Sequence, residues 1–184
     1  MNKHTKFVAL DIETTGLDFT QHEIIEIGCV LFCFDPKKKT FKVEEEFDIK
    51  IKPQNIELAD KTSLKVNKYT PEEWKDAGTL LSALKKLNKR LDGRVMVAHN
   101  AVFDHAFIEK AFRENHIKNT LHYHVFDTLS MAFLAIQGSD TNQLSLRALC
   151  EHFGIENKKA HTALSDAKAT YELFVKLLES PLTR

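Results

Sequence analysis

The first fifty residues show a pattern of apolar and polar positions that predicts three β-strands. Apolar side chains alternate with polar ones or form short runs over residues 6–13, 24–34 and 41–51, as in strands packed against a core. The connections are short, and Asp35-Pro36 is typical of a turn. Strands joined by short turns usually pair with their neighbours, so we expect an antiparallel meander.

The rest of the chain changes to a helical period. Apolar residues from Glu72 to Leu91 recur at helical intervals, and Asp92-Gly93 is expected to end that helix. We expect short strands at residues 95–98 and around Val125, and helices at residues 102–115, 128–136, 145–153 and 162–178. An antiparallel opening followed by alternating strands and helices predicts an α/β fold. We expect a mixed sheet, with an antiparallel meander and then parallel strands, flanked by helices. No linker or repeat divides the chain, so we expect one domain over residues 1–184.

Composition and charge exclude several classes of protein. The content of 43% hydrophobic and 28% charged residues is that of a globular chain, and no apolar stretch approaches membrane-spanning length. Lysine plus arginine equals aspartate plus glutamate at 26 each, so affinity for a polyanion must come from local patches or bound metal. The basic residues on the outer face of the long helix are interpreted as solvated rather than as phosphate contacts; they are Lys85, Lys86, Lys89 and Arg90.

The cysteines predict a reducing environment. Cys29 and Cys33 lie four apart on an expected strand, which separates them by about 13 Å and is too far for a disulfide. Cys150 has no partner in a Cys-x-x-Cys motif. We therefore expect reduced thiols and a cytoplasmic protein.

The first candidate site is Asp-Ile-Glu-Thr-Thr-Gly at residues 11–16. Because side chains alternate along a strand, Asp11 and Glu13 project from one face while the apolar residues between them point into the core. Two adjacent carboxylates repel each other unless a cation shares them or solvent screens them, and a hard divalent metal is the natural partner. The alternative is an exposed acidic strand end ahead of a glycine turn.

The second candidate segment begins where the fourth expected strand ends. Asp104 closes the segment His-Asn-Ala-Val-Phe-Asp at residues 99–104, at the start of an expected helix. An acid in a first helical turn is common for dipole reasons alone. Asp104 nevertheless lies near the strand ends, where Asp11 and Glu13 are also expected.

The third segment is His-Thr-Ala-Leu-Ser-Asp at residues 161–166. A continuous helix would place His161 and Asp166 about 140° apart, so they could not share a site. Thr162 is a good N-cap, which would leave His161 in the preceding loop and Asp166 in the first turn. An imidazole beside metal-bound carboxylates is suited to accept a proton from water, although a histidine before a helix is usually structural or merely exposed.

Together these segments resemble the three exonuclease motifs of the DnaQ-like family in order, spacing and type of element. The resemblance is to DEDD-type 3′→5′ exonucleases of the histidine subclass, which include the epsilon proofreading subunit of bacterial replicative polymerases and ribonuclease T. It runs from about residue 6 to residue 178 and takes in Ile-Ile-Glu-Ile-Gly on the second strand, Asp127-Thr128 and residues 144–154. It implies a ribonuclease H-like fold, in agreement with the mixed sheet expected above.

By motif position, the resemblance implies that four carboxylates hold two Mg²⁺ or Mn²⁺ ions. Asp11 would bridge both ions, and Glu13 and Asp166 would complete the site of the ion that activates water. Asp104 would serve the ion at the leaving 3′ oxygen, and His161 would be the general base. Such a set matches in-line phosphodiester hydrolysis between two ions, and the cations would supply the positive charge that a neutral chain lacks.

The resemblance also implies a pocket for the terminal nucleotide, formed by Thr14, Thr15, Gly16, Leu17, Val66, Asn67, Asn100 and Phe103. The turn would approach the sugar and Leu17 the base; a β-turn with an apolar anchor is the alternative. Core packing is the alternative for Phe103. Lys68 stands where relatives often carry glycine, which leaves the backbone shape of that loop open. Asp127 would support the site through hydrogen bonds.

We therefore expect a metal-dependent 3′→5′ exonuclease of proofreading or repair type that releases 5′-mononucleotides from single-stranded DNA. One alternative is a 3′→5′ exoribonuclease of RNA maturation or turnover. The other is a non-catalytic nucleic-acid-binding module, against which the intact set of five motif residues argues. Expected partners are single-stranded 3′ ends, DNA ahead of RNA, with no membrane.

Only residues 179–184 follow the last expected helix. The polymerase-binding extension of the epsilon subunit is thus not evident, and a free-standing nuclease is expected. Neither polymerase association nor a homodimer is evident from the sequence.

Overall fold

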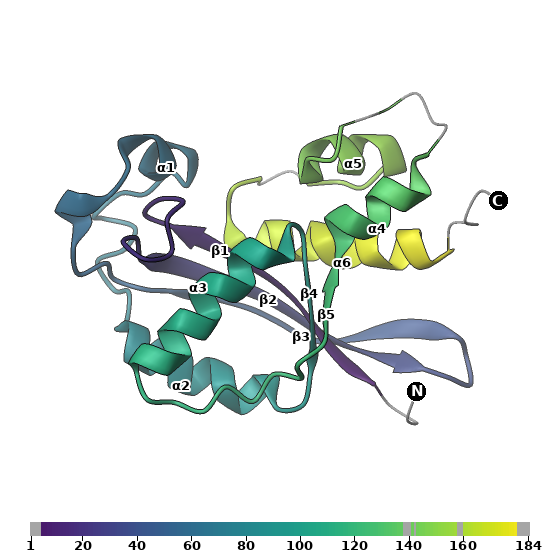
Figure 1. Cartoon of the computed structure of the whole chain (residues 1–184), viewed down its shortest axis with the longest axis horizontal. Helices are drawn as coiled ribbons and strands as arrows, with labels where there is room; N and C mark the ends of the chain where they lie inside the picture. Colours follow the sequence, from purple (N-terminus) through teal and green to yellow (C-terminus); the bar gives the residue numbers. More distant parts are fainter. Residues whose placement is uncertain (1–4, 138–140, 142, 158–159, 180–184) are drawn as a thin grey trace.

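A five-stranded mixed sheet organises the protein (Figure 1), whose computed structural model describes residues 5–137, 141, 143–157 and 160–179. The strand order is β3-β2-β1-β4-β5. The strands are β1 (Lys6–Thr14), β2 (Ile24–Asp35), β3 (Thr40–Lys50), β4 (Val95–Ala98) and β5 (Val125–Asp127). The β1–β2 and β2–β3 pairs are antiparallel, whereas β1–β4 and β4–β5 are parallel. This confirms the predicted antiparallel opening followed by parallel strands.

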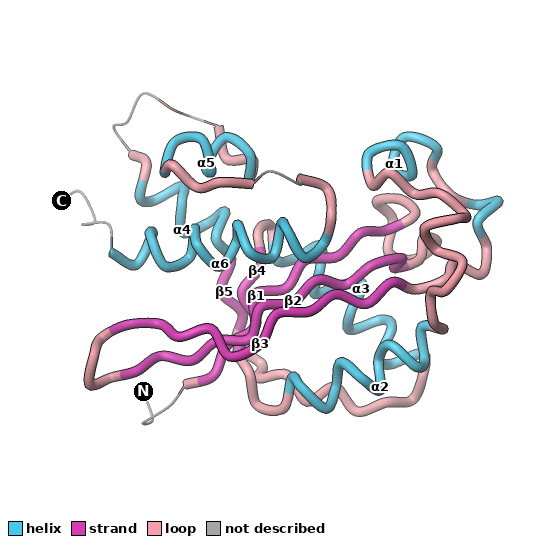
Figure 2. Tube along the Cα trace, turned by 180° about the vertical axis from the view of Figure 1, so that it is seen from behind, coloured by secondary structure: helices cyan, strands magenta, loops and turns pink. Residues whose placement is uncertain are grey.

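Helices cover both faces of the sheet (Figure 2). The long helices are α2 (Leu80–Leu91), α3 (Ala101–Glu114) and α6 (Ala163–Glu179), and the short ones near α6 are α4 (Thr128–Ala135) and α5 (Leu146–Phe153). Along β1, Val8 and Leu10 are buried in the core beneath α2 and α3, while Phe7 and Ala9 are buried beneath α6. The alternation of β1 thus supplies two apolar layers from one strand.

The helix predicted from Glu72 is wrong over its first part. Residues 71–76 form turns, and α2 begins only after Thr79, whose side chain accepts a hydrogen bond from Ser82 N at 3.2 Å. Trp74 is buried although it lies outside α2, and its Nε1 donates to Ile25 O at 2.9 Å. Gly78 O meanwhile accepts from Lys52 N at 2.9 Å, which holds this segment against the end of β3. The apolar spacing of the segment therefore reflects core contacts of a turn.

A short helix and a 3₁₀ turn were not predicted. They are α1 (Lys61–Val66) and η1 (Ile56–Leu58). Helix α1 buries none of its residues and is capped by Asp60, whose carboxylate accepts from Thr62 N at 2.6 Å. Such a helix has no apolar stripe from which the sequence could reveal it.

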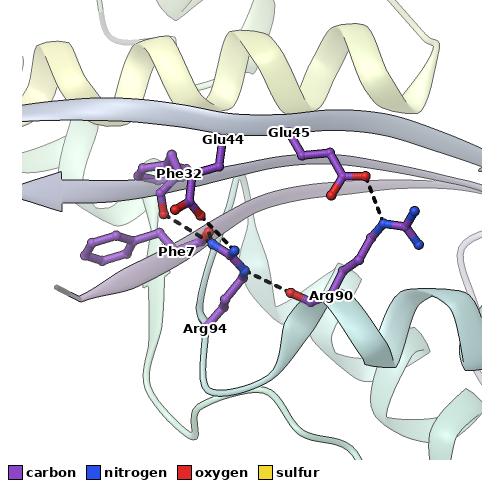
Figure 3. Close-up of polar contacts among 6 residues, drawn as sticks. All are labelled: Phe7, Phe32, Glu44, Glu45, Arg90 and Arg94. Atoms are coloured by element: carbon purple, nitrogen blue, oxygen red, sulfur yellow. Dashed lines mark hydrogen bonds and ion pairs between the residues drawn. The ribbon is translucent and has the colours of Figure 1, made fainter.

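A buried arginine joins the strands at the end of the sheet where β1 begins (Figure 3). Arg94 is only 8% exposed. Its guanidinium donates to Phe7 O at 3.2 Å and to Glu44 Oε2 at 2.8 Å, and its Nε donates to Arg90 O at 2.9 Å. Because the planar guanidinium offers five donors, one side chain can tie α2, β1 and β3 together.

The cysteines agree with the expectation from the sequence. Cys29, Cys33 and Cys150 are all free, as predicted. Among the residues that the structure describes, no helix is long and apolar enough to cross a bilayer.

Candidate active site

Three carboxylates from two elements meet at the end of β1. Asp11 and Glu13 follow Phe7 and Ala9 on the face of β1 that α6 covers. Asp166 lies in the first turn of α6. One oxygen from each of Asp11, Glu13 and Asp166 falls within 4.8 Å of the other two. The period of the strand and the first turn of the helix thus bring together acids that are more than 150 residues apart in the chain.

Gly28 explains why α6 can begin so close to β1. It pairs with Asp11 on the neighbouring strand. A Cβ at this position would lie 2.1 Å from the carbonyl carbon of Ala163 and 2.2 Å from the nitrogen of Leu164. Only glycine therefore lets the first turn of α6 rest directly on β2, which sets the place of Asp166.

Asp166 is held by its own surroundings as well. Its Oδ1 accepts from Asn157 Nδ2 at 2.6 Å, and its Oδ2 accepts from the backbone nitrogen of His161 at 3.0 Å. Asn157 also accepts from Ser165 Oγ at 2.8 Å. The loop before α6 thereby fixes the carboxylate that the helix presents.

Asp104 completes the acidic group from the other side of β1. It is 3% exposed, and its Oδ1 accepts from the backbone nitrogen of Ile12 at 3.1 Å. That nitrogen is available because β4 pairs with β1 only as far as Ala9. Asp104 lies outside the group of three defined above, but its bond to Ile12 places it between Asp11 and Glu13.

Burial and mutual repulsion make these carboxylates reluctant to ionise together. Burial, followed by the charges of Asp104 and Asp166, raises the pKa of Asp11 well above its usual value. Burial and the neighbouring carboxylates also raise the pKa of Glu13 to about 8. For Asp104, burial raises the pKa to about 8 against the hydrogen bond from Ile12. Each group therefore needs a proton or a cation.

The donor set suits a hard divalent cation. It consists of carboxylate oxygens, which Mg²⁺ and Mn²⁺ prefer. Among the described residues, none of the lysine or arginine ion pairs involves these four carboxylates. Within the part of the chain that the structure describes, no ion pair therefore neutralises their charge.

His161 lies in the loop before α6, as Thr162 at the expected cap position implied. Helix α6 begins at Ala163, and His161 has a left-handed backbone with φ of 67°. Its side chain is exposed, and its contact with Asp166 is through the backbone nitrogen. The structure thus brings His161 to the rim of the acidic group.

Threonine side chains in the turn after β1 form hydrogen bonds with nearby backbone atoms. Thr14 Oγ1 donates to Gly16 O at 2.7 Å, and Thr15 Oγ1 accepts from Glu23 N at 2.9 Å. A Cβ at Gly16 would lie 2.3 Å from the ring of His22. Leu17, by contrast, is 76% exposed at the tip of this turn, so it is the member of the turn with a free apolar surface.

The remaining pocket residues divide into exposed and structural ones. Val66 is exposed, whereas Asn67 is buried and donates from Nδ2 to Thr14 O at 2.7 Å. Asn100 is exposed with φ of 63°. Phe103 is half-buried and packs on Phe107 with ring centroids 5.0 Å apart. The core-packing alternative for Phe103 therefore has direct structural support.

Asp127 supports the start of α3 through hydrogen bonds, in agreement with the role expected for it. Its Oδ1 accepts from the backbone nitrogens of Asn100 at 2.9 Å and Ala101 at 3.2 Å. Its Oδ2 accepts from Ser130 N at 3.2 Å. Asp127 therefore fixes the helix that carries Asp104 without joining the acidic group.

Sequence reasoning missed Asn157, Gly28 and Glu26 as parts of the site. Asn157 carries no signal in the sequence, because its role depends on where its loop folds. Gly28 and Glu26 stand in the Ile-Ile-Glu-Ile-Gly segment that had been noticed only as a resemblance. Glu26 pairs with Glu13 across the strands and is 5% exposed, and burial raises its pKa to about 7.

Comparison with known families and curated sequences agrees with these motifs. The model of the exonuclease family matches residues 8–174. The DNA polymerase III PolC-type protein of Caldanaerobacter subterraneus subsp. tengcongensis is 36% identical over 174 residues, which are 95% of this chain and 12% of that protein. The chain thus spans about an eighth of that relative.

Two relatives are closer to this chain in length. The DNA polymerase III epsilon subunit of Treponema pallidum is 32% identical over 97% of this chain and 79% of its own length. Ribonuclease T of Wigglesworthia glossinidia brevipalpis is 30% identical over 93% of this chain and 83% of its own length.

Among solved structures, the zinc-bound complex of E. coli exonuclease I with single-stranded DNA superposes with a TM-score of 0.79. The match covers 95% of this chain and 40% of that one at 20% sequence identity. At that identity the likeness shows a common fold.

Proposed function

The chain belongs to the DnaQ-like exonuclease family, whose model spans residues 8–174, and from this premise we propose that it is a metal-dependent 3′→5′ exonuclease acting on single-stranded DNA. The observation that carries the proposal is the meeting of Asp11, Glu13 and Asp166 within 4.8 Å, with Asp104 bonded to the backbone between the first two. In a nuclease, carboxylates placed in this way can bind cations. The cations neutralise negative charge at the reacting phosphate, which phosphodiester hydrolysis requires.

We propose that these four carboxylates hold two Mg²⁺ or Mn²⁺ ions. Asp11 would contribute to both sites, Glu13 and Asp166 to one, and Asp104 to the other. When bound, such ions acidify a water molecule and stabilise the departing oxygen. The raised pKa values of Asp11, Glu13 and Asp104 support the proposal, because a bound cation would offset the burial that raises all three and the repulsion from neighbouring carboxylates that adds to it at Asp11 and Glu13.

His161 is proposed as the general base. Its imidazole would accept the proton of the attacking water as the water oxygen bonds to phosphorus and the bond from phosphorus to the 3′ oxygen breaks. The products would be a nucleoside 5′-monophosphate and a strand shortened by one nucleotide, with its 3′ hydroxyl restored. The exposed position of His161 at the rim of the acidic group supports this role, since a base must reach solvent to return its proton.

The terminal nucleotide is proposed to bind between the turn after β1 and α1. Leu17 and Val66 offer exposed apolar surface for a base. The backbone at Thr14, Thr15 and Gly16 would face the sugar, while Asn67 holds α1 against the end of β1. Asn100 and Phe103 would border the pocket from α3.

DNA is the proposed substrate because the relatives that span most of this chain include a DNA polymerase III subunit. Ribonuclease T is also a relative, and it favours the RNA alternative. A DNA polymerase partner and a homodimer are further alternatives. A cytoplasmic location stays a prediction.

The test is digestion of 3′-labelled and 5′-labelled DNA and RNA oligonucleotides side by side with Mn²⁺. We expect a descending ladder from the 5′-labelled DNA and released mononucleotide from the 3′-labelled DNA. A ladder on RNA alone would replace DNA by RNA as the substrate. No shortening of any strand, or activity that persists in a chelator, would contradict the proposal.

A further inference from the structure

A lysine occupies a backbone position next to the acidic group that favours glycine. Lys68 follows α1 and has φ of 54°, in the left-handed region. A residue with a Cβ is strained there, and glycine is not. The side chain of Lys68 is therefore the feature to explain.

The side chain of Lys68 bridges two segments on either side of the end of β1. Asn67 fastens the end of α1 to β1 through Thr14, and Lys68 Nζ donates to Ala160 O at 3.3 Å. Ala160 immediately precedes His161. Figure 1 shows the segment with α1 and the segment leading into α6 on either side of the end of β1. The ammonium group thus lies beside the loop that carries His161, whose backbone nitrogen donates to Asp166 at 3.0 Å.

In this position the Lys68 ammonium group still has donors with which to bind an anion. It has three donors, and Ala160 O occupies one of them. Lys68 is exposed, and none of the ion pairs within residues 5–137, 141, 143–157 and 160–179 involves it. Its charge also lowers the pKa of Glu13 against the larger effect of burial, in keeping with a cation close to that carboxylate.

We infer that Lys68 binds a phosphate of the substrate strand beside the acidic group and, through Ala160, holds the loop that carries His161. The inference rests on the proposed function. Because lysine and arginine equal aspartate and glutamate in number, the net charge gives no attraction for a polyanion. A single cation beside the reacting phosphate then matters both for affinity and for the position of the loop.

The test separates the ammonium from the backbone strain. Lys68→Met removes the charge and keeps the strain, Lys68→Gly removes both, and Lys68→Arg keeps a cation. Lys89→Ala removes an exposed lysine from the last turn of α2 and is the matched control. The probe is a 5′-fluorescein oligothymidylate, whose binding is followed by anisotropy in Ca²⁺ over a series of salt concentrations, with a gel showing that the strand stays intact.

We expect Lys68→Met and Lys68→Gly to weaken binding about fivefold and to reduce the slope of log affinity against log salt by about 0.7, the value for one phosphate of a single strand. Lys68→Arg and Lys89→Ala should keep the wild-type slope. With Mn²⁺, the Met and Gly variants should also lose kcat, because the His161 loop is no longer held.

An unchanged salt slope in both neutral variants would overturn the inference, even if binding weakened, because it would show that no phosphate contact was lost. If the wild-type protein shortens DNA and the Lys68 variants match it in salt slope and rate, the inference is overturned but the proposed function is not. Wild-type protein that neither binds nor shortens any strand would overturn the proposed function and this inference with it.

Discussion

At the scale of single residues, the site depends on groups that are individually common. Asp11 and Glu13 form an acidic strand end, Asp104 an acid in a first helical turn, and Asp166 another. The fold distinguishes them, because burial raises the pKa of Asp11, Glu13 and Asp104, and neighbouring carboxylates raise those of Asp11 and Glu13 further. His161 differs from these four because it is exposed and left-handed in backbone.

His161→Ala should lower kcat by about 10²–10⁴-fold, the range for loss of a general base, and leave Mn²⁺ affinity unchanged. Single-turnover cleavage of a labelled strand measures the rate. His116→Ala is the matched control, because His116 is also exposed with φ of 54°, and it should keep the wild-type rate. A His161→Ala rate equal to wild type would remove this residue from the role of base.

The acids of the site could be predicted from the sequence, but their bonds could not. Period-two alternation places Asp11 and Glu13 on one face, and the cap at Thr162 separates His161 from Asp166. The contact of Asp104 with Ile12 depends on β4 ending its pairing at Ala9. No local pattern encodes where a neighbouring strand stops.

At the scale of elements, the placement of α6 decides the site. The helix rests on β2 at Gly28, where the Ala163 carbonyl carbon would lie 2.1 Å from an added Cβ. Because the obstacle is backbone on a packed helix, no side-chain rotation can relieve it. Any side chain at residue 28 must lift the first turn of α6 and carry Asp166 away from Asp11.

Gly28→Ala should therefore lower kcat by about 100-fold or more, the usual effect of misplacing a reacting group by about an ångström. Circular dichroism should still show a folded α/β protein. Gly78→Ala is the control, because its Cβ would meet only the flexible side chain of Ser82 at 2.9 Å. Equal rates for the two variants would show that the close approach at Gly28 does not position the site.

The opposite end of the sheet should affect stability without affecting chemistry. Arg94→Met removes the hydrogen bonds to Phe7 and Glu44 and should cost about 2–3 kcal/mol of unfolding free energy, the range for a charge-assisted buried contact. Urea unfolding measures it, and Glu44→Gln should cost less because an acceptor remains. A full loss of activity in folded Arg94→Met protein would contradict this separation.

Element prediction failed where local pattern and tertiary contact diverge. Trp74 has helical spacing from later residues, but it is buried in a turn where its Nε1 donates to Ile25 O. The helix predicted from Glu72 begins only at Leu80. Helix α1 was missed because none of its residues is buried. In the first case tertiary contacts outweigh periodicity, and in the second the sequence has no apolar periodicity that would reveal the helix.

At the scale of the whole molecule, the sheet was predictable because apolar residues recur with a strand period in the opening meander and with a helical period in the later crossover segments. The order β3-β2-β1-β4-β5 puts β1 in the centre, so its end receives residues from α3 on one face and α6 on the other. Side chains at the end of a central strand are held by core on both sides. The cost is a set of buried acids that weakens the metal-free fold.

These buried acids predict how the stability of the metal-free protein varies with pH. The folded pKa values of Glu13, Asp104 and Glu26, about 8, 8 and 7, lie above ordinary carboxyl values, so the folded state keeps protons that the unfolded chain releases. The stabilisation that these three groups add to the free energy of unfolding is complete below about pH 4 and is lost as the pH rises toward 8. In a chelator, the melting temperature should fall from about pH 5 to pH 8 by on the order of 5 °C.

Mn²⁺ should raise the melting temperature more at about pH 8 than at about pH 5, because protons compete with the cation for the same carboxylates. Glu26→Gln should remove the part of the pH dependence that ends near pH 7 and should also lower the pKa of Glu13, which the charge of Glu26 raises. A metal-free melting temperature that rises steadily over this range would contradict the assignment of buried, proton-retaining acids.

The central claim is that the acidic group at the end of β1 holds divalent cations for hydrolysis. Its most direct test is calorimetric titration of Mn²⁺, in the presence of a nucleoside 5′-monophosphate, into wild-type, Asp11→Asn and Asp92→Asn protein, the last removing an exposed acid at the end of α2. We predict two Mn²⁺ per chain for wild type and Asp92→Asn, and loss of both binding and cleavage for folded Asp11→Asn. Wild-type protein that binds no Mn²⁺, or Asp11→Asn protein that binds and cleaves like wild type, would contradict the account.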